Sequence, residues 1–132
     1  FVPLIQATAG NVGVQSSAIV VQGLANDTLK GNIAGRLLKE TALALINGLS
    51  IALIVLIFSH LFFNTTYLES ISIGLAVVVV ILIAALVGTF VPMLLDKKGI
   101  DPAVATGPFI TTSNDVFGIL IYFLIAKLIL GI

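Results

Sequence analysis

The run ISIGLAVVVVILIAALVGTFVPMLL at residues 71–95 decides the class of fold, because it contains no charged side chain. A membrane-spanning helix needs roughly 20 mostly apolar residues, so this run is long enough to cross a bilayer. Residues 41–63, TALALINGLSIALIVLIFSHLFF, form a second uncharged run. Both are too continuous for the alternating strands of about ten residues that form outer-membrane barrels. The two runs therefore predict membrane-spanning helices.

Two less uniform stretches flank this pair. Residues 1–22 are uncharged but rich in polar and small side chains, and residues 102–131 are apolar except for a few polar positions. Both are long enough to span a bilayer as helices. We therefore expect residues 1–132 to form an all-α, polytopic membrane helix bundle with four visible transmembrane helices.

The composition supports this class and excludes others. The chain is 59% hydrophobic and 9% charged, with a mean hydropathy of +1.24, whereas soluble domains carry about a quarter charged residues. Six Lys and Arg balance six Asp and Glu, which argues against nucleic acid as a partner. With no cysteine and a single histidine, His60, the usual zinc and iron–sulfur sites are excluded. No nucleophile–base pair is visible, so an enzyme is not expected.

Positive charges predict the orientation. Lys and Arg gather in residues 23–40 and 96–101, while residues 64–70 have none. By the positive-inside rule the first two connections are cytoplasmic and the third is outside, in a multi-pass protein of the plasma or inner membrane. Lys127 would then extend to the outer interface. This topology places both chain ends outside and predicts a further inward-to-outward span before Phe1.

The connection 23–40 has two interpretations. Asn26, Asp27 and Thr28 are candidate helix caps, and apolar residues recur after them at four-residue steps. This pattern favours a short amphipathic helix on the cytoplasmic surface. A solvated turn fits equally well.

The middle two spans, residues 41–63 and 71–95, are expected to form the scaffold of the bundle. Gly48 with Ala52, and Ala84 with Gly88, have the small-xxx-small spacing that lets helices approach closely. Pro92 is expected to end or kink its helix.

The first span has two distinct faces. Thr8, Asn11, Gln15 and Gln22 share one helical face. A second face carries the small residues Ala9, Gly13 and Ser17, suited to close packing. Gly10 and Gly13 flank Asn11 and would open backbone carbonyls to a water-filled path. The alternative is a tight helix–helix seam in which the amides bond between helices.

Asp115 is the sharpest signal in the last span. Asp101-Pro102 predicts a helix start, and Gly107-Pro108 predicts a break soon after it. Asp115 then lies within the apolar region, where an acid is costly unless it faces water, a partner or an ion. Thr111 and Gly118 are expected on its face. A cation pathway, a proton relay and an ion pair with another segment or subunit are all open. Magnesium suits one or two carboxylates and retained waters, and calcium or manganese would fit the same ligands.

Two long motifs resemble a known family. The runs PLIQATAGNVGVQSSA and DPAVATGPFITTSNDVFGILIYFLIAKLIL are similar to the transmembrane domain of the MgtE family of magnesium channels. The resemblance implies a homodimer with five transmembrane helices per subunit and a pore on the dimer axis. It also implies that the first and last spans line the pore and that Asp115 holds hydrated Mg²⁺. The family's G-G-N-x-G-x-Q-S run matches here, except that Ala9 replaces its first glycine.

The function expected is therefore a divalent-cation channel, with Mg²⁺ as the transported ion and Mn²⁺, Ca²⁺ or Co²⁺ as further possibilities. Asp115 is the metal-binding residue. The pore-lining candidates are Thr8, Gly10, Asn11, Gly13, Gln15, Thr111, Thr112 and Gly118. Two alternatives are an exchanger that couples Mg²⁺ to Na⁺ or H⁺, and a non-conducting membrane subunit whose polar helices mediate assembly.

Overall fold

The computed structural model describes residues 2–25, 33–105 and 107–131. These residues are all-α, as predicted from the sequence. The elements are α1 (Val2–Ala25), α2 (Ile33–Phe62), α3 (Tyr67–Lys97), a short 3₁₀ helix η1 (Pro102–Ala105) and α4 (Pro108–Leu130).

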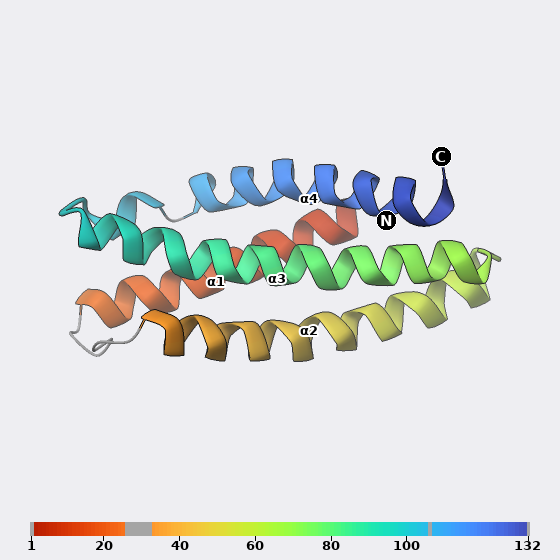
Figure 1. Cartoon of the computed structure of the whole chain (residues 1–132), viewed down its shortest axis with the longest axis horizontal. Coiled ribbons are helices and arrows are strands. Elements are labelled where there is room, and N and C mark those ends of the chain that lie inside the picture. The colour runs from red at the N-terminus through yellow and green to blue at the C-terminus, as the bar shows by residue number, and fades with distance from the viewer. Residues whose placement is uncertain (1, 26–32, 106, 132) are drawn as a thin grey trace.

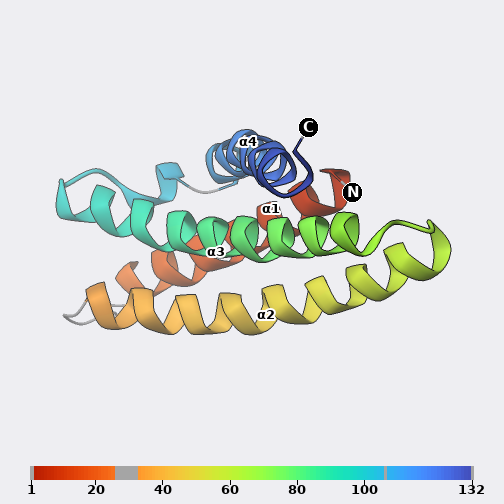
Figure 2. The same cartoon turned by 45° about the vertical axis from the view of Figure 1, so that its right-hand side comes forward.

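Helix α3 is the centre of the bundle. It packs against α1, α2 and α4, whereas α1 and α2 have few contacts with each other (Figures 1 and 2). Its buried face consists of small and β-branched side chains, among them Ala76, Val77, Val80, Ile81 and Ala84. Such residues let neighbouring helices approach closely in a membrane protein. The hydrophobic core therefore lies along α3, and α1 and α4 meet beside it.

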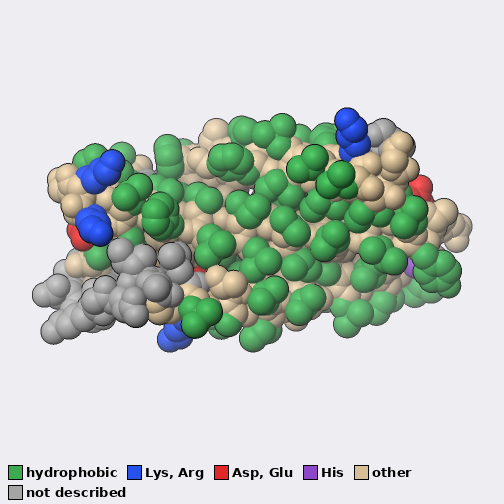
Figure 3. Space-filling model, viewed as in Figure 1, with side chains coloured by type: hydrophobic (Ala, Val, Ile, Leu, Met, Phe, Trp, Pro, Cys, Tyr) green, Lys and Arg blue, Asp and Glu red, His purple; other side chains and the backbone are tan. Residues whose placement is uncertain are grey.

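The face of the bundle shown in Figure 3 is apolar over its middle, and its charged side chains lie toward the ends. Among the described residues, three helices are long and apolar enough to cross a membrane: Leu38–Phe62, Tyr67–Lys97 and Pro108–Leu130. Helix α1 is not in this set. Its amides and hydroxyls, which the sequence also shows, lower its hydropathy. Of the four predicted spans, three meet this criterion of length and composition.

The helix that carries the second predicted span begins before residue 41. Helix α2 starts at Ile33, so residues 33–40 continue into the span and do not form a separate surface helix or turn. Glu40 is consequently buried, with 6% of its surface exposed. The proposed caps Asn26, Asp27 and Thr28 lie outside the described residues.

Helix α3 also begins earlier than expected, because Thr66 and Glu69 form a capping box. The Thr66 hydroxyl accepts a bond from the Glu69 N–H at 3.2 Å, and the Glu69 carboxylate accepts one from the Thr66 N–H at 2.8 Å. At the other end, α3 continues past Pro92 to Lys97, so of the two effects predicted for Pro92 the end of the helix is wrong, and the kink stays a prediction. A proline removes its own N–H and its ring crowds the carbonyl four residues earlier, but the helix around Pro92 remains formed.

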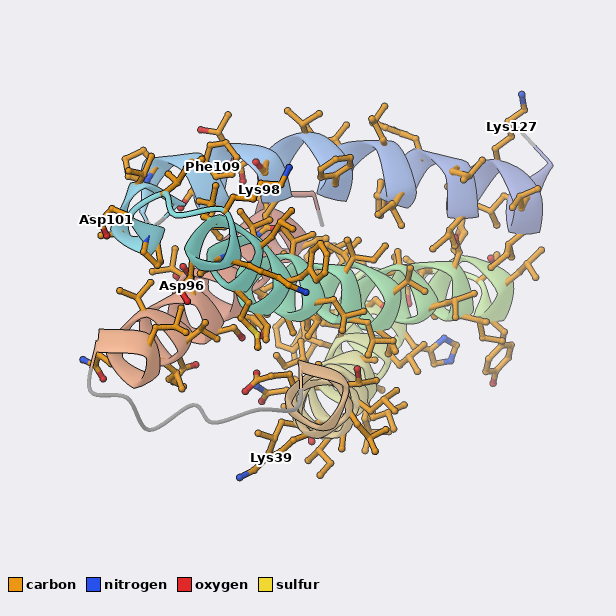
Figure 4. The ribbon with its side chains drawn as sticks, turned by 60° about the vertical axis from the view of Figure 1, so that its left-hand side comes forward. Lys39, Asp96, Lys98, Asp101, Phe109 and Lys127 are labelled. Atoms are coloured by element: carbon orange, nitrogen blue, oxygen red, sulfur yellow. The ribbon has the colours of Figure 1, made fainter. Side chains whose placement is uncertain are left out.

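The start of α4 follows the prediction. The Asp101 carboxylate accepts a bond from the Ala103 N–H at 3.0 Å at the start of η1. Gly107 then adopts a positive φ of 57°, which separates η1 from α4. Lys127 lies near the far end of α4 from Asp101 (Figure 4). The helix that carries Asp115 therefore begins at a defined break.

A carboxylate and amide cavity between α1 and α4

Asp115 is half-buried where α4 passes α1, beside a cavity of about 320 Å³. Two residues of α4 line this cavity, Thr111 and Asp115, which are one helical turn apart. The remaining wall comes from α1: Gln6, Ala7, Gly10, Asn11, Val14, Gln15 and Ala18. We call this the Asp115 cavity. It brings the most polar part of α1 against the acid of α4.

Two amide side chains join α1 to α4 reciprocally. Gln6 of α1 donates from Nε2 to the backbone carbonyl of Asp115 at 3.4 Å. Asn114 of α4 donates from Nδ2 to the backbone carbonyl of Ala9 at 3.3 Å. We call Gln6 and Asn114 the reciprocal amide pair. Because both acceptors are backbone carbonyls, neither of these bonds uses the carboxylate of Asp115.

Glycines allow the three helices to meet closely behind the cavity. A Cβ at Gly13 would overlap the side-chain amide of Asn114, and a Cβ at Gly88 would overlap the Gly13 carbonyl. This confirms the packing role predicted for Gly88, and Gly48 likewise packs against the backbone of Val78. Ala9, Gly13 and Ser17 are all buried, as expected for the close-packing face of α1.

The structure brings together five of the predicted site residues: Gly10, Asn11, Gln15, Thr111 and Asp115. The remaining pore-lining candidates lie outside the cavity, for distinct reasons. The Thr8 hydroxyl donates to the Leu4 carbonyl of its own helix at 2.7 Å, and Thr112 is exposed on α4. Gly13 is covered by Asn114, and Gly118 is buried against Val80 of α3.

The sequence left two alternatives open for the polar residues of α1, and the structure shows bonds between helices as one of them required. Gln6 bonds between helices, as the seam alternative required. Asn11 and Gln15 are exposed and line the cavity, whereas the opening of backbone carbonyls to a water-filled path stays a prediction. Neither Gln6 nor Asn114 was selected from the sequence. Their positions could have pointed to them in the sequence. Gln6 lies one turn before Gly10, and Asn114 directly precedes Asp115.

The chemistry of the cavity suits a hydrated, hard cation. No Lys or Arg is among the lining residues, so none of them neutralises Asp115. The described part of the chain contains no group of three or more His, Asp or Glu that could enclose a bare ion. A single carboxylate with nearby amide and hydroxyl oxygens instead matches an ion that keeps most of its waters, as Mg²⁺ does.

A helix bundle with an apolar exterior and an acidic, amide-lined cavity defines an integral membrane protein with a site suited to a hard cation. The sequence profile of the MgtE family, described as a divalent cation transporter, matches residues 2–125. The chain belongs to this family.

Curated relatives agree with the assignment. The chain is 43% identical over 129 residues to a magnesium transporter MgtE of Enterococcus faecalis, and the match covers 97% of the chain. It is 34% identical over 131 residues, or 98% of the chain, to the magnesium transporter MgtE of Thermus thermophilus. The chain spans 28% of the length of the first relative and 29% of the second.

Proposed function

We propose that this chain forms part of a channel that carries hydrated Mg²⁺ through a pore on the axis of a homodimer. The observation that carries the proposal is the position of Asp115, which lines a cavity together with the exposed residues Asn11 and Gln15. Family membership and the named relatives support magnesium as the transported ion.

The donor set explains why a second subunit would be needed. One chain supplies one carboxylate to the cavity, and Mg²⁺ is typically held by one or two carboxylates with several waters retained. Two-fold symmetry is the commonest arrangement of oligomers and would bring two Asp115 side chains around one axis. Thr111, Asn11 and Gln15 would then bond the waters of the ion.

The proposal includes the topology predicted from the sequence. All four helices would cross the plasma or inner membrane, with α1 and α4 lining the pore and a further helix completing each subunit. Of the connection predicted at 23–40, the part between α1 and α2, residues 26–32, would be cytoplasmic together with residues 96–101, and residues 64–70 would be outside. In support, the end of α1, the start of α2 and the end of α3 lie at the same end of the bundle (Figure 1).

The membrane potential would drive the ion inward without a coupled ion. The potential contributes about 2.3 kcal/mol per charge per 100 mV, and therefore about twice that for a divalent cation. Voltage-driven flux without a counter-ion gradient is thus the behaviour expected of the channel. An Mg²⁺ exchanger would require a Na⁺ or H⁺ gradient.

The test is Mg²⁺ entry into proteoliposomes that contain the full-length transporter, measured with a trapped dye under an imposed potential. Asp115→Asn removes the charge and keeps the size of the side chain. We expect it to abolish most of the flux while the protein stays dimeric. Asp96→Asn is the matched control, because Asp96 is exposed at the end of α3 and should leave flux unchanged.

Each other result would exclude part of the proposal. Equal flux in the Asp115→Asn protein would remove Asp115 from the pathway. Flux that requires a Na⁺ or H⁺ gradient would establish an exchanger. Absence of flux in the unaltered protein, together with dissociation of the Asp115→Asn protein, would favour an assembly subunit. Equal entry of Mn²⁺, Ca²⁺ or Co²⁺ would overturn selectivity for magnesium.

A further inference from the structure

Glu40 is a buried carboxylate that the proposed pathway does not use. Only 6% of its surface is exposed, and it is the one buried charged side chain among the described residues. The neighbouring Lys39 is exposed and points away from the bundle (Figure 4). A carboxylate removed from water needs hydrogen bonds to compensate for its lost hydration. The burial of Glu40 therefore indicates that its carboxylate has a structural role.

One contact of Glu40 reaches the helix that lines the Asp115 cavity. The Ser16 hydroxyl of α1 donates to Oε2 of Glu40 at 3.3 Å, and Ser16 is 5% exposed. Helices α1 and α2 have few other contacts, because each packs mainly on α3. The Ser16–Glu40 bond thus directly links two helices that each pack mainly on α3.

The bond lies beside a second cavity, of about 290 Å³, between α1 and α2. Both Ser16 and Glu40 line it, and so does Gln15. Gln15 also lines the Asp115 cavity, so this residue is shared by the two cavities. A shift of α1 relative to α2 would therefore move an amide that faces the proposed ion path.

We propose that Glu40 is a positioning residue that holds the C-terminal half of α1 against α2 through Ser16. It thereby fixes Gln15 at the edge of the Asp115 cavity. The reciprocal amide pair holds the N-terminal half of α1 against α4, so α1 is attached to different helices along its length. The effect on transport rests on the proposed function, whereas the effect on helix position does not.

The first measurement reports helix position alone. The chain contains no cysteine, so spin labels can be introduced at Ile19→Cys in α1 and Leu43→Cys in α2, which line the second cavity. Electron–electron distances are measured in the full-length, otherwise cysteine-free transporter. Labelled protein is diluted with unlabelled protein so that only distances within one chain are detected. We expect a single distance that broadens in the Glu40→Ala and Ser16→Ala proteins.

The second measurement is Mg²⁺ flux per folded protein in the same variants without labels. We expect Glu40→Ala and Ser16→Ala each to lower flux by about tenfold, the factor that corresponds to one hydrogen bond to a charged group. The double variant should be no worse than Glu40→Ala alone. Glu40→Gln keeps an oxygen acceptor and should restore both flux and distance. Ser50→Ala is the matched control, because the exposed Ser50 hydroxyl bonds the Ile46 carbonyl of its own helix.

The outcomes separate this inference from the proposed function. A distance that stays unchanged in Glu40→Ala and Ser16→Ala would overturn the positioning role, and so would additive losses in the double variant. A Glu40→Gln protein as impaired as Glu40→Ala would show that charge, rather than the hydrogen bond, matters. If the unaltered protein carries no flux, the proposed channel is wrong while the distance measurement still decides the role of Glu40.

Discussion

Replacement of Gly13 by alanine tests the close packing behind the Asp115 cavity. The new Cβ would overlap the Asn114 amide and lie 2.9 Å from Cγ2 of Ile110. Overpacking of this kind costs about 1–3 kcal/mol, while alanine gains about 1 kcal/mol over glycine in a helix. We therefore expect Gly13→Ala to lower the free energy of unfolding by up to about 2 kcal/mol.

A second substitution, Asn114→Ala, should restore most of the stability lost in Gly13→Ala, because the new Cβ mainly overlaps the side chain of Asn114. Asn114→Ala removes the bond to the Ala9 carbonyl, worth about 0.5–1.5 kcal/mol. It also removes the buried Oδ1 of Asn114, which has no partner and which costs about 1–3 kcal/mol to bury. Alone it should be nearly neutral. Combined with Gly13→Ala it should leave room for the new methyl group, with a coupling energy of about 1–3 kcal/mol.

Gly88→Ala is the contrasting control. Its Cβ would meet the backbone of Gly13, which Asn114→Ala does not change. The assay is unfolding by sodium dodecyl sulfate, followed by far-ultraviolet circular dichroism of the full-length protein. We expect Asn114→Ala to rescue Gly13→Ala but not Gly88→Ala. Additive effects of Gly13→Ala and Asn114→Ala, or equal rescue of both glycine variants, would refute the packing described for these three helices.

Two further substitutions are read by the same unfolding assay. Thr66→Ala removes the capping box of α3 and should lower the free energy of unfolding by about 1 kcal/mol; an unchanged midpoint would contradict the role of that cap. Thr89→Val replaces a fully buried hydroxyl that has no hydrogen-bond partner and should raise the free energy of unfolding by about 1 kcal/mol, whereas a destabilised protein would reveal a bond that the hydroxyl makes.

The sequence predicted the class of fold because long apolar runs report helices directly. It also predicted the break at Gly107, since a glycine followed by a proline interrupts a helix locally. The start of α2 was harder to predict. Charged residues suggested a surface connection over 23–40, but Glu40 is buried and accepts a hydrogen bond from Ser16 in another helix. A contact between distant residues has no signature in a single sequence.

The candidate site was predicted in part for a similar reason. Polar residues in an apolar span stand out, so Asp115, Asn11 and Gln15 could be selected from composition and spacing. Spacing along one helix does not determine which face meets a neighbour. Gly13 and Gly118 were expected to line a pore; within this chain Gly13 packs against α3 and α4 and Gly118 against α3, and both are buried. Gln6 and Asn114 were missed because their bonds join helices far apart in the sequence.

The reciprocal amide pair limits how α1 and α4 can move. A piston-like slide of α4 by one helical turn, about 5.4 Å, would break the bonds from both Gln6 and Asn114. Other carbonyls would come into reach, but Asn114 fits where it does because Gly13 leaves space for its amide. The reciprocal amide pair and Gly13 therefore favour one register of α4 along α1. Any transition that moves one of these two helices would therefore have to move α1 and α4 together as one rigid unit.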